Sequence, residues 1–180
     1  HRALAKKNYE RVFIGSQNNF SFPGNDNIFY ISSDGENKHI KVKKTIKIKM
    51  PKSATIKMNV RHGEVKLAEN TKNIKANLNY SSLLASTIDG KDTYVTASYS
   101  PVSVANWNLG QLNADYSENV NLKIVKDLKL SSVSSNIEIG ELLKTVFVQN
   151  DFGKVTINKI SDGFSTLDVS LQNGELECSL

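Results

Sequence analysis

Residues 112–122 read LNADYSENVNL, with apolar side chains at alternate positions on both sides of a polar centre at Tyr116-Ser117. Alternation with a period of two is typical of β-strands that bury one face. Asp, Ser and Asn are common in tight turns, because their short polar side chains bond to the nearby backbone. The stretch therefore predicts two short strands joined by a turn.

The same pattern recurs from residue 56 to the last residues of the chain. The first apolar positions of successive units are Ile56, Ile74, Tyr94, Leu112, Leu128, Val146 and Leu167, which follow one another at steps of 18, 20, 18, 16, 18 and 21 residues. The pairs expected on the second strands are Val65/Leu67, Leu83/Ala85, Val102/Val104, Val120/Leu122, Ile137/Ile139, Val155/Ile157 and Leu176/Cys178. One such unit cannot bury its apolar face alone, whereas stacked units form a continuous core. The sequence predicts an all-β, single-domain β-solenoid of about seven short rungs.

An ordinary β-sandwich or barrel is the alternative fold, because it would also show alternation. Such a fold would not need the same offsets in successive units. The left-handed hexapeptide helix does not fit, because its aliphatic residues recur every six positions, and calcium-binding nonapeptide repeats are absent. The 180 residues, 39% of them hydrophobic, suffice for one core.

Residues 1–50 do not follow the repeat. Ile40–Met50 reads as one long strand that ends at Pro51, since proline cannot donate to a β-ladder. Terminal repeats of solenoids are atypical and must shield the end of the core. We therefore expect residues 1–50 to form a β capping segment of the same domain and residues 51–180 to hold the solenoid repeats.

Residues 46–56, IKIKMPKSATI, resemble the strand, Pro-Lys-x-Ala and strand that lead into the domain of a bacterial adhesin-like family of unknown function. The turns at Tyr80, Tyr99 and Tyr116 and the stretch NDFGKVTI at 150–157 are similar to its repeated units, although several turns carry Ser where the family often has Gly. The likeness covers residues 40–180. It implies a β-solenoid on an exported bacterial protein of the cell envelope, in the periplasm, on the outer surface or outside the cell, and it brings no catalytic motif.

Lysines alternate along the strand expected before Pro51. Lys41, Lys43, Lys47 and Lys49 would form a positive strip about 27 Å long at ~3.3 Å per residue. Such a strip fits a polyanion, such as a charged glycan or a phospholipid surface. The other interpretation is a solvated face that protects an edge strand from aggregation. Nucleic acid is not an expected partner, because no basic helix or aromatic RNA-binding motif is visible.

Tyrosines occupy matching places just before three successive turns, at Tyr80, Tyr99 and Tyr116. If they face outward they form an aromatic ladder, with Trp107 near it. Exposed aromatic rows bind sugar rings or anchor protein partners. The other interpretation is a ladder that packs only against itself and stabilises the turns. These tyrosines and the four lysines are the candidate binding residues.

The sequence contains no motif for catalysis or metal binding. His39 and His62 stand in no triad or metal-ligand spacing, and the acidic turn at 89–92 lacks the regular spacing of a calcium loop. No metal or cofactor is expected. A polysaccharide-active enzyme stays open as an alternative, because scattered carboxylates can converge in space. Cys178 is the single cysteine, which excludes a disulfide framework, and its place on a repeated apolar position predicts burial.

The charge of the chain is uneven. Residues 1–75 hold 16 Lys and Arg against 6 Asp and Glu, and residues 76–180 hold 7 against 12. No apolar run reaches the ~18 residues of a membrane span, and a first residue other than Met suggests a mature or trimmed chain. We expect a non-catalytic, exported cell-envelope module for binding, adhesion or scaffolding, whose partner is a glycan or an envelope protein. A ligand-free structural spacer is the further alternative.

Overall fold

The computed structural model describes residues 10–12, 27–34, 37–49, 51, 54–67, 69 and 71–179 of the chain. The chain forms two compact units, His1–Met50 and Pro51–Leu180. Every regular element among the described residues is a β-strand, so the all-β prediction is confirmed. The capping role expected for residues 1–50 stays a prediction.

The first unit contains a three-stranded antiparallel sheet with the order β1-β2-β3. Its strands are β1 (Glu10–Val12), β2 (Asn27–Asp34) and β3 (Asn37–Lys44). Apolar residues pair across the β2–β3 ladder, with Phe29 opposite Val42 and Ile31 opposite Ile40.

The long strand predicted over Ile40–Met50 is wrong in its second half. Strand β3 ends at Lys44, and residues 45–49 are exposed and form no strand. The physical reason is the length of the partner: Lys44 pairs with Asn27, which is the first residue of β2, so the ladder ends there. A strand needs a partner for its backbone hydrogen bonds, and alternation of lysines cannot supply one.

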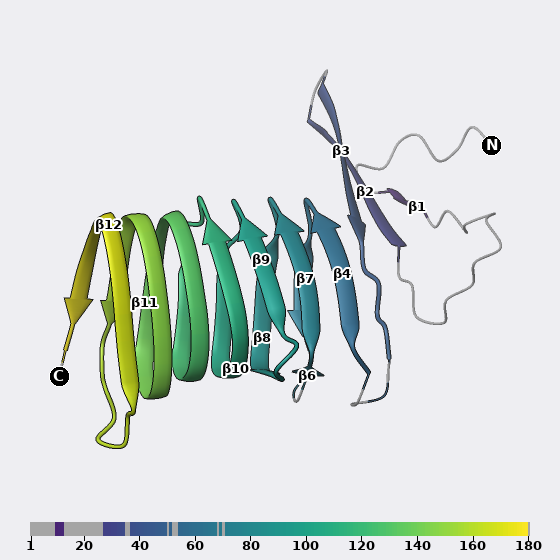
Figure 1. The fold of residues 1–180 in the computed structure, drawn as a ribbon. Coiled ribbons are helices and arrows are strands. Elements are labelled where there is room, and N and C mark those ends of the chain that lie inside the picture. Colours follow the sequence, from purple (N-terminus) through teal and green to yellow (C-terminus); the bar gives the residue numbers. More distant parts are fainter. Residues whose placement is uncertain are drawn as a thin grey trace, which may run out of the picture. The chain divides into compact units, whose positions relative to one another are not determined.

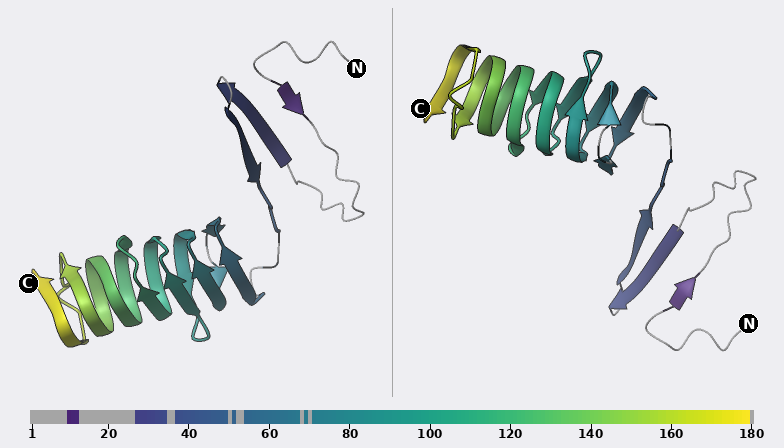
Figure 2. Two further views of the ribbon diagram at one scale, coloured as in Figure 1. Left: turned by 90° about the horizontal axis from the view of Figure 1, so that it is seen from above. Right: turned by 90° about the horizontal axis from the view of Figure 1, so that it is seen from below.

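The second unit is a β-solenoid of about seven stacked turns, as predicted (Figures 1 and 2). Its strands are β4 (Ile56–Arg61), β5 (Glu64–Leu67), β6 (Thr71–Lys72), β7 (Ile74–Asn79), β8 (Ser82–Asp89), β9 (Tyr94–Ser98), β10 (Val102–Asp115), β11 (Val120–Ile157) and β12 (Thr166–Cys178). The strand pairs between them are parallel, and paired residues lie between 17 and 21 positions apart in the sequence. Each turn consists of two strands, and the long strands β10 and β11 pass around the corners in strand conformation (Figure 1).

The register agrees with the prediction on the second strand of each turn. Val65 pairs with Leu83, Leu83 with Val102, and Val102 with Val120. Farther along the coil, Val155 pairs with Leu176. Leu83, Val102, Val120 and Val155 are buried, because residues that share a register column in a parallel sheet also share a face, whereas Leu176 in the last strand is exposed.

On the first strand, the predicted starts at Tyr94 and Leu112 are wrong. Leu112 pairs with Val95 and Leu130, and Gly110 is the residue that pairs with Leu128. Tyr94 pairs with Lys75 and lies on the outer face, while Val95 pairs with Ala76 and is fully buried. The buried residue two positions before Val95 is Thr93. Its hydroxyl donates to the carbonyl of Asp89 at 2.9 Å. A satisfied hydroxyl can replace an aliphatic side chain in a core, and the apolar pattern alone did not show this.

The core is one continuous cluster of Val, Leu, Ile and Ala side chains that runs along the axis of the coil. Trp107 is its largest fully buried side chain. The prediction that Cys178 is buried is wrong, since the thiol is exposed. Its slot lies in the last strand, β12, and among the described residues no further turn stacks on that strand. Trp107 lies in the core and takes no part in an aromatic ladder.

Candidate functional site

One corner of the coil carries a left-handed residue in every turn. These residues are His62, Tyr80, Tyr99, Tyr116, Ser134, Phe152 and Asn173, with φ between 48° and 61°. Bulky residues rarely adopt this conformation, which costs an L-residue roughly 1–2 kcal/mol. The corner therefore needs interactions that offset the strain.

A ladder of buried serines supplies such interactions directly after the left-handed residues. The backbone N–H groups of Ser81, Ser100 and Ser117 each donate to the hydroxyl of the serine in the next turn, at 3.0 Å in all three cases. Each serine hydroxyl also donates a hydrogen bond to the carbonyl two residues earlier in the sequence, as Ser100 does to Ser98 at 2.7 Å. The last member, Ser135, donates to the carbonyls of Ala114 and Val133. The corner is thus held by side-chain hydrogen bonds that link turn to turn.

Replacing Ser117 by alanine should lower the free energy of unfolding by about 1–3 kcal/mol, because the buried N–H of Ser100 loses its acceptor. The exposed Ser134 of the same corner provides the matched control, and Ser134→Ala should change stability by less than ~0.5 kcal/mol. Urea denaturation followed by circular dichroism measures both values. Equal stability of the two variants would contradict the role assigned to the serine ladder.

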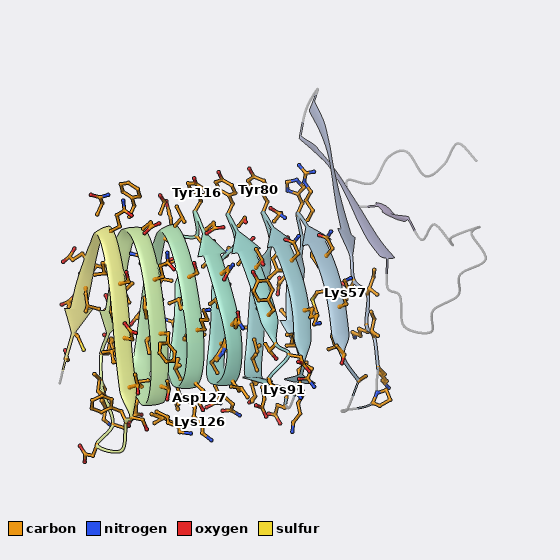
Figure 3. The ribbon with its side chains drawn as sticks, in the orientation of Figure 1. Lys57, Tyr80, Lys91, Tyr116, Lys126 and Asp127 are labelled. Atoms are coloured by element: carbon orange, nitrogen blue, oxygen red, sulfur yellow. The ribbon has the colours of Figure 1, made fainter. Side chains whose placement is uncertain are left out.

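The left-handed residues place four aromatic rings in one stack, which we call the aromatic ladder: His62, Tyr80, Tyr99 and Tyr116. Successive ring centroids lie 5.3, 4.9 and 5.1 Å apart, and the interplanar angles are 18°, 5° and 10°. The three tyrosines are about half exposed, and Figure 3 shows Tyr80 and Tyr116 projecting from one edge of the coil. The stack expected of the tyrosines is present. His62 was not among the candidate binding residues. Its position in the turn of the first repeat, which matches that of the tyrosines in later repeats, could have identified it.

The geometry of the ladder limits what it can contact. In a parallel stack, the faces of inner rings are covered by their neighbours, so Tyr80 and Tyr99 offer ring edges and phenol hydroxyls to the solvent. The far face of Tyr116 has a different environment, because the next left-handed residue is Ser134. A ring follows again at Phe152, which is half exposed.

A shallow polar depression of about 350 Å³ lies on the outer face of the second strands, beside this end of the ladder. Its lining residues come from three adjacent turns and are Glu118, Asn119, Val120, Asn121, Asn136, Ile137, Glu138, Lys154 and Thr156. Glu138 accepts hydrogen bonds from the amides of Asn121 at 3.0 Å and Asn158 at 2.9 Å. The depression thus combines carboxylates, amides and an ammonium group on a rigid sheet.

The candidate lysines do not form the predicted strip. Lys41 and Lys43 belong to β3, opposite Tyr30 and Ile28, whereas Lys47 and Lys49 follow its end and are exposed. The lysines lie in the unit His1–Met50 and the tyrosines in the unit Pro51–Leu180. The strip of four lysines on one strand face is therefore a wrong prediction, because β3 is too short to carry it.

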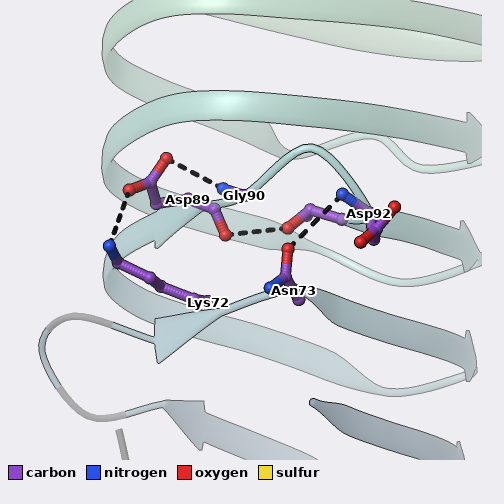
Figure 4. Close-up of polar contacts among 6 residues, drawn as sticks. Lys72, Asn73, Asp89, Gly90 and Asp92 are labelled. Carbon is purple, nitrogen blue, oxygen red and sulfur yellow. Dashed lines mark hydrogen bonds and ion pairs between the residues drawn. The ribbon is translucent and has the colours of Figure 1, made fainter. Parts of the chain in front are cut away.

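The acidic turn after β8 is closed by its own hydrogen bonds (Figure 4). Asp89 accepts from the backbone of Gly90 at 2.8 Å and pairs with Lys72 at 3.8 Å. Asn73 accepts from the backbone of Asp92 at 3.4 Å. The Asp89 carboxylate therefore stabilises the turn in which it lies. Within the part of the chain that the structure describes, no group of three or more His, Cys, Asp or Glu could hold a metal ion.

Several carboxylates on the outer faces are held in ion pairs. Lys159 approaches Glu141 to 2.8 Å, and its hydrogen bond together with that of Ser161 lowers the pKa of the Glu141 carboxyl. Lys154 approaches Glu177 to 2.7 Å and lowers the pKa of that carboxyl too. A lowered pKa keeps a carboxyl ionised at neutral pH, which is opposite to what a general acid requires. These groups are suited to hydrogen bonding and to fixing the sheet surface.

Comparison with protein-family models, with curated proteins and with solved structures gave no significant match to this chain. Among the described residues there is no helix with the length and hydropathy of a membrane span. The fold and the surface of the solenoid are therefore the basis for inferring function.

Proposed function

We propose that this chain is a non-catalytic binding module of an exported cell-envelope protein and that it binds an extended glycan along the aromatic ladder. The observation that carries the proposal is the half-exposed stack of His62, Tyr80, Tyr99 and Tyr116. Solenoids offer long rigid surfaces of this kind for ligands. The resemblance to bacterial adhesin-like domains supports the location and the class of function.

The repeat of the ladder supports a polymeric ligand. Parallel strands fix the ring-to-ring distances at 4.9 to 5.3 Å, so phenol hydroxyls and ring edges recur at nearly equal steps. Successive pyranose rings of an extended β-1,4-linked polysaccharide follow one another at a similar spacing. Each sugar residue can therefore contact one aromatic side chain of the ladder. The phenol hydroxyls would form hydrogen bonds with the sugar hydroxyls, and the ring edges would contact the apolar parts of the sugar.

The rigidity of the ladder favours binding. Stacking against neighbouring rings restricts each side chain of the aromatic ladder. The hydrogen bonds of the serine ladder fix the left-handed backbone that carries these side chains. Little side-chain entropy is then lost when a ligand is bound, which is the usual benefit of a preorganised surface.

The double variant Tyr80→Ala/Tyr99→Ala tests the proposal, because it removes the middle of the ladder and leaves Tyr116 in place. We expect about tenfold or weaker binding, a loss of about 1.4 kcal/mol, to a β-1,4-linked polysaccharide. Immobilised cellulose, chitin, xylan and alginate are suitable probes, at low and high salt. Neutral polysaccharide binding should be insensitive to salt, because uncharged sugars release no counterions.

Tyr94→Ala is the matched control. Tyr94 is an exposed tyrosine outside the ladder, and its hydroxyl accepts from the amide of Asn113 at 2.8 Å. The control should bind as the wild type does. If the double variant retained full affinity while remaining folded, the ladder would have only a structural role. Binding that disappears at high salt would instead indicate a polyanion bound by lysines.

A further inference from the structure

The aromatic ladder is interrupted at one position, where a serine takes the place of a ring. Ser134 occupies the left-handed corner position between Tyr116 and Phe152, and its side chain is exposed. The backbone stays in register across this turn, since the N–H of Tyr116 donates to Val133 at 2.8 Å and that of Asn136 donates to Ser117 at 3.2 Å. The turn is therefore stacked normally and only the ring is absent.

The size of the space follows from the spacing of the turns. Two strand spacings separate the corner positions of Tyr116 and Phe152, which amounts to about 9.6 Å. Inside the ladder, single steps between rings measure 4.9 to 5.3 Å. One inserted six-membered ring would thus lie one such step from the ring of Tyr116 and one strand spacing from the corner position of Phe152.

The chemistry beside the space favours a ring that carries hydroxyl groups. Glu118, Asn136 and Lys154 line the polar depression, and each lies two positions after a corner residue, at Tyr116, Ser134 and Phe152 respectively. The carbonyl of the Asn136 amide accepts from the backbone of Lys154 at 3.3 Å, which fixes the Asn136 side chain against the sheet. The Lys154 ammonium is held by Glu177 at 2.7 Å and Glu175 at 3.7 Å, so the carboxylate of Glu118 and the amide of Asn136 are the groups that can bind hydroxyls of one ring.

We propose that the gap at Ser134 binds a single pyranose ring, with its apolar faces against Tyr116 and Phe152 and its hydroxyls directed to Glu118 and Asn136. This inference rests on the proposed function, because it takes glycan as the ligand and names the subsite that holds one sugar by its faces. The inner rings cannot do this, since their faces are covered. A planar aromatic ligand would fill the same space but would leave the polar side of the site without partners.

Ser134→Tyr tests the subsite by filling it with the chain's own ring. Tyrosine is tolerated at this corner position in three other turns, so the variant should fold with an unfolding midpoint no lower than that of the wild type. Methyl glucopyranoside, methyl galactopyranoside, methyl mannopyranoside and N-acetylglucosamine serve as probes in ¹H–¹⁵N NMR titrations. In the wild type, at least one sugar should shift the amide signals of residues 134–136 and 152–154, and Ser134→Tyr should weaken its binding by about tenfold or more.

Ser134→Gly is the matched control, because it keeps the space open and suits the left-handed backbone. It should bind the sugar as the wild type does, and Phe152→Ala should weaken binding as Ser134→Tyr does. Equal sugar binding by the wild type and Ser134→Tyr would overturn the subsite, and so would shifts caused by indole but by none of the sugars. The proposed function is tested separately: loss of polysaccharide binding in Tyr80→Ala/Tyr99→Ala supports the ladder whatever the single sugars do, whereas single-sugar binding that is equal in the wild type and Ser134→Tyr refutes the subsite alone.

Discussion

Replacing Trp107 by alanine should lower the free energy of unfolding by about 3–5 kcal/mol, which is the usual cost of removing a buried aromatic side chain. Trp107 is fully buried in β10, and its neighbours in the register are Ile88 on one side and Val125 on the other. The cavity would open in the interior of the coil, between turns that are tied to one another by parallel ladders. Such turns cannot close over a void without breaking backbone hydrogen bonds.

Two further variants make the result for Trp107 specific. Trp107→Phe should recover much of the lost stability, because it keeps a ring and removes an indole N–H that has no hydrogen-bond partner among the described residues. Leu109→Ala, on the same strand but exposed, should cost less than ~1 kcal/mol. Urea denaturation followed by far-ultraviolet circular dichroism suits all three, since the tryptophan itself is changed. A Trp107→Ala protein as stable as Leu109→Ala would contradict this account of the core.

Gly153→Ala should cost about 2–5 kcal/mol, because it combines backbone strain with overpacking. Gly153 has a φ of 105°, and an added Cβ would lie 2.2 Å from the carbonyl oxygen of Ser135 in the preceding turn. That oxygen belongs to the backbone and cannot move aside without separating two turns of the coil.

Gly163→Ala is the control for this prediction. A Cβ at Gly163 would meet no described atom within 4 Å, and the substitution should change stability by less than ~1 kcal/mol in either direction. Thermal and urea denaturation of both variants provide the comparison. A Gly153→Ala variant that unfolds at the same urea concentration as Gly163→Ala would show that the corner is less rigid than the structure indicates.

The repeat explains why the fold could be predicted from the sequence, and its errors have identifiable causes. Offsets of 2, 7 and 2 residues recur, and they correspond to the two strands of a turn and the corner that joins them. The start at Tyr94 was misplaced by one position because Thr93 buries a hydroxyl where an aliphatic residue was expected. The start at Leu112 was misplaced by two positions because Gly110, which has no side chain, pairs with Leu128. Cys178 was assigned to the core because its slot is apolar in earlier turns, but burial requires a neighbouring turn on each side.

The candidate site was predicted only in part. Matching places before the turns identified Tyr80, Tyr99 and Tyr116 as possible members of one row, and the structure stacks them together with His62. The strip of lysines failed because the length of β3 depends on its partner β2, which alternation along a single strand does not reveal. The gap at Ser134 and the depression beside it involve three turns at once, so no local pattern indicates them.

The sequence by itself determined the all-β class, the number of turns and the corner at which the tyrosines lie, because a period of two and a regular repeat act through local geometry and through burial of one face. The tertiary structure alone decided which ring faces are covered, which carboxylates are held by lysines and where one ring is missing. The physical reason is the stacking of parallel strands: it brings residues 17 to 21 positions apart to within about 5 Å of one another. Contacts at that distance depend on the register between turns. Where a polar residue such as Thr93 takes a buried aliphatic position, the apolar pattern of the sequence no longer shows which residues of neighbouring turns pair.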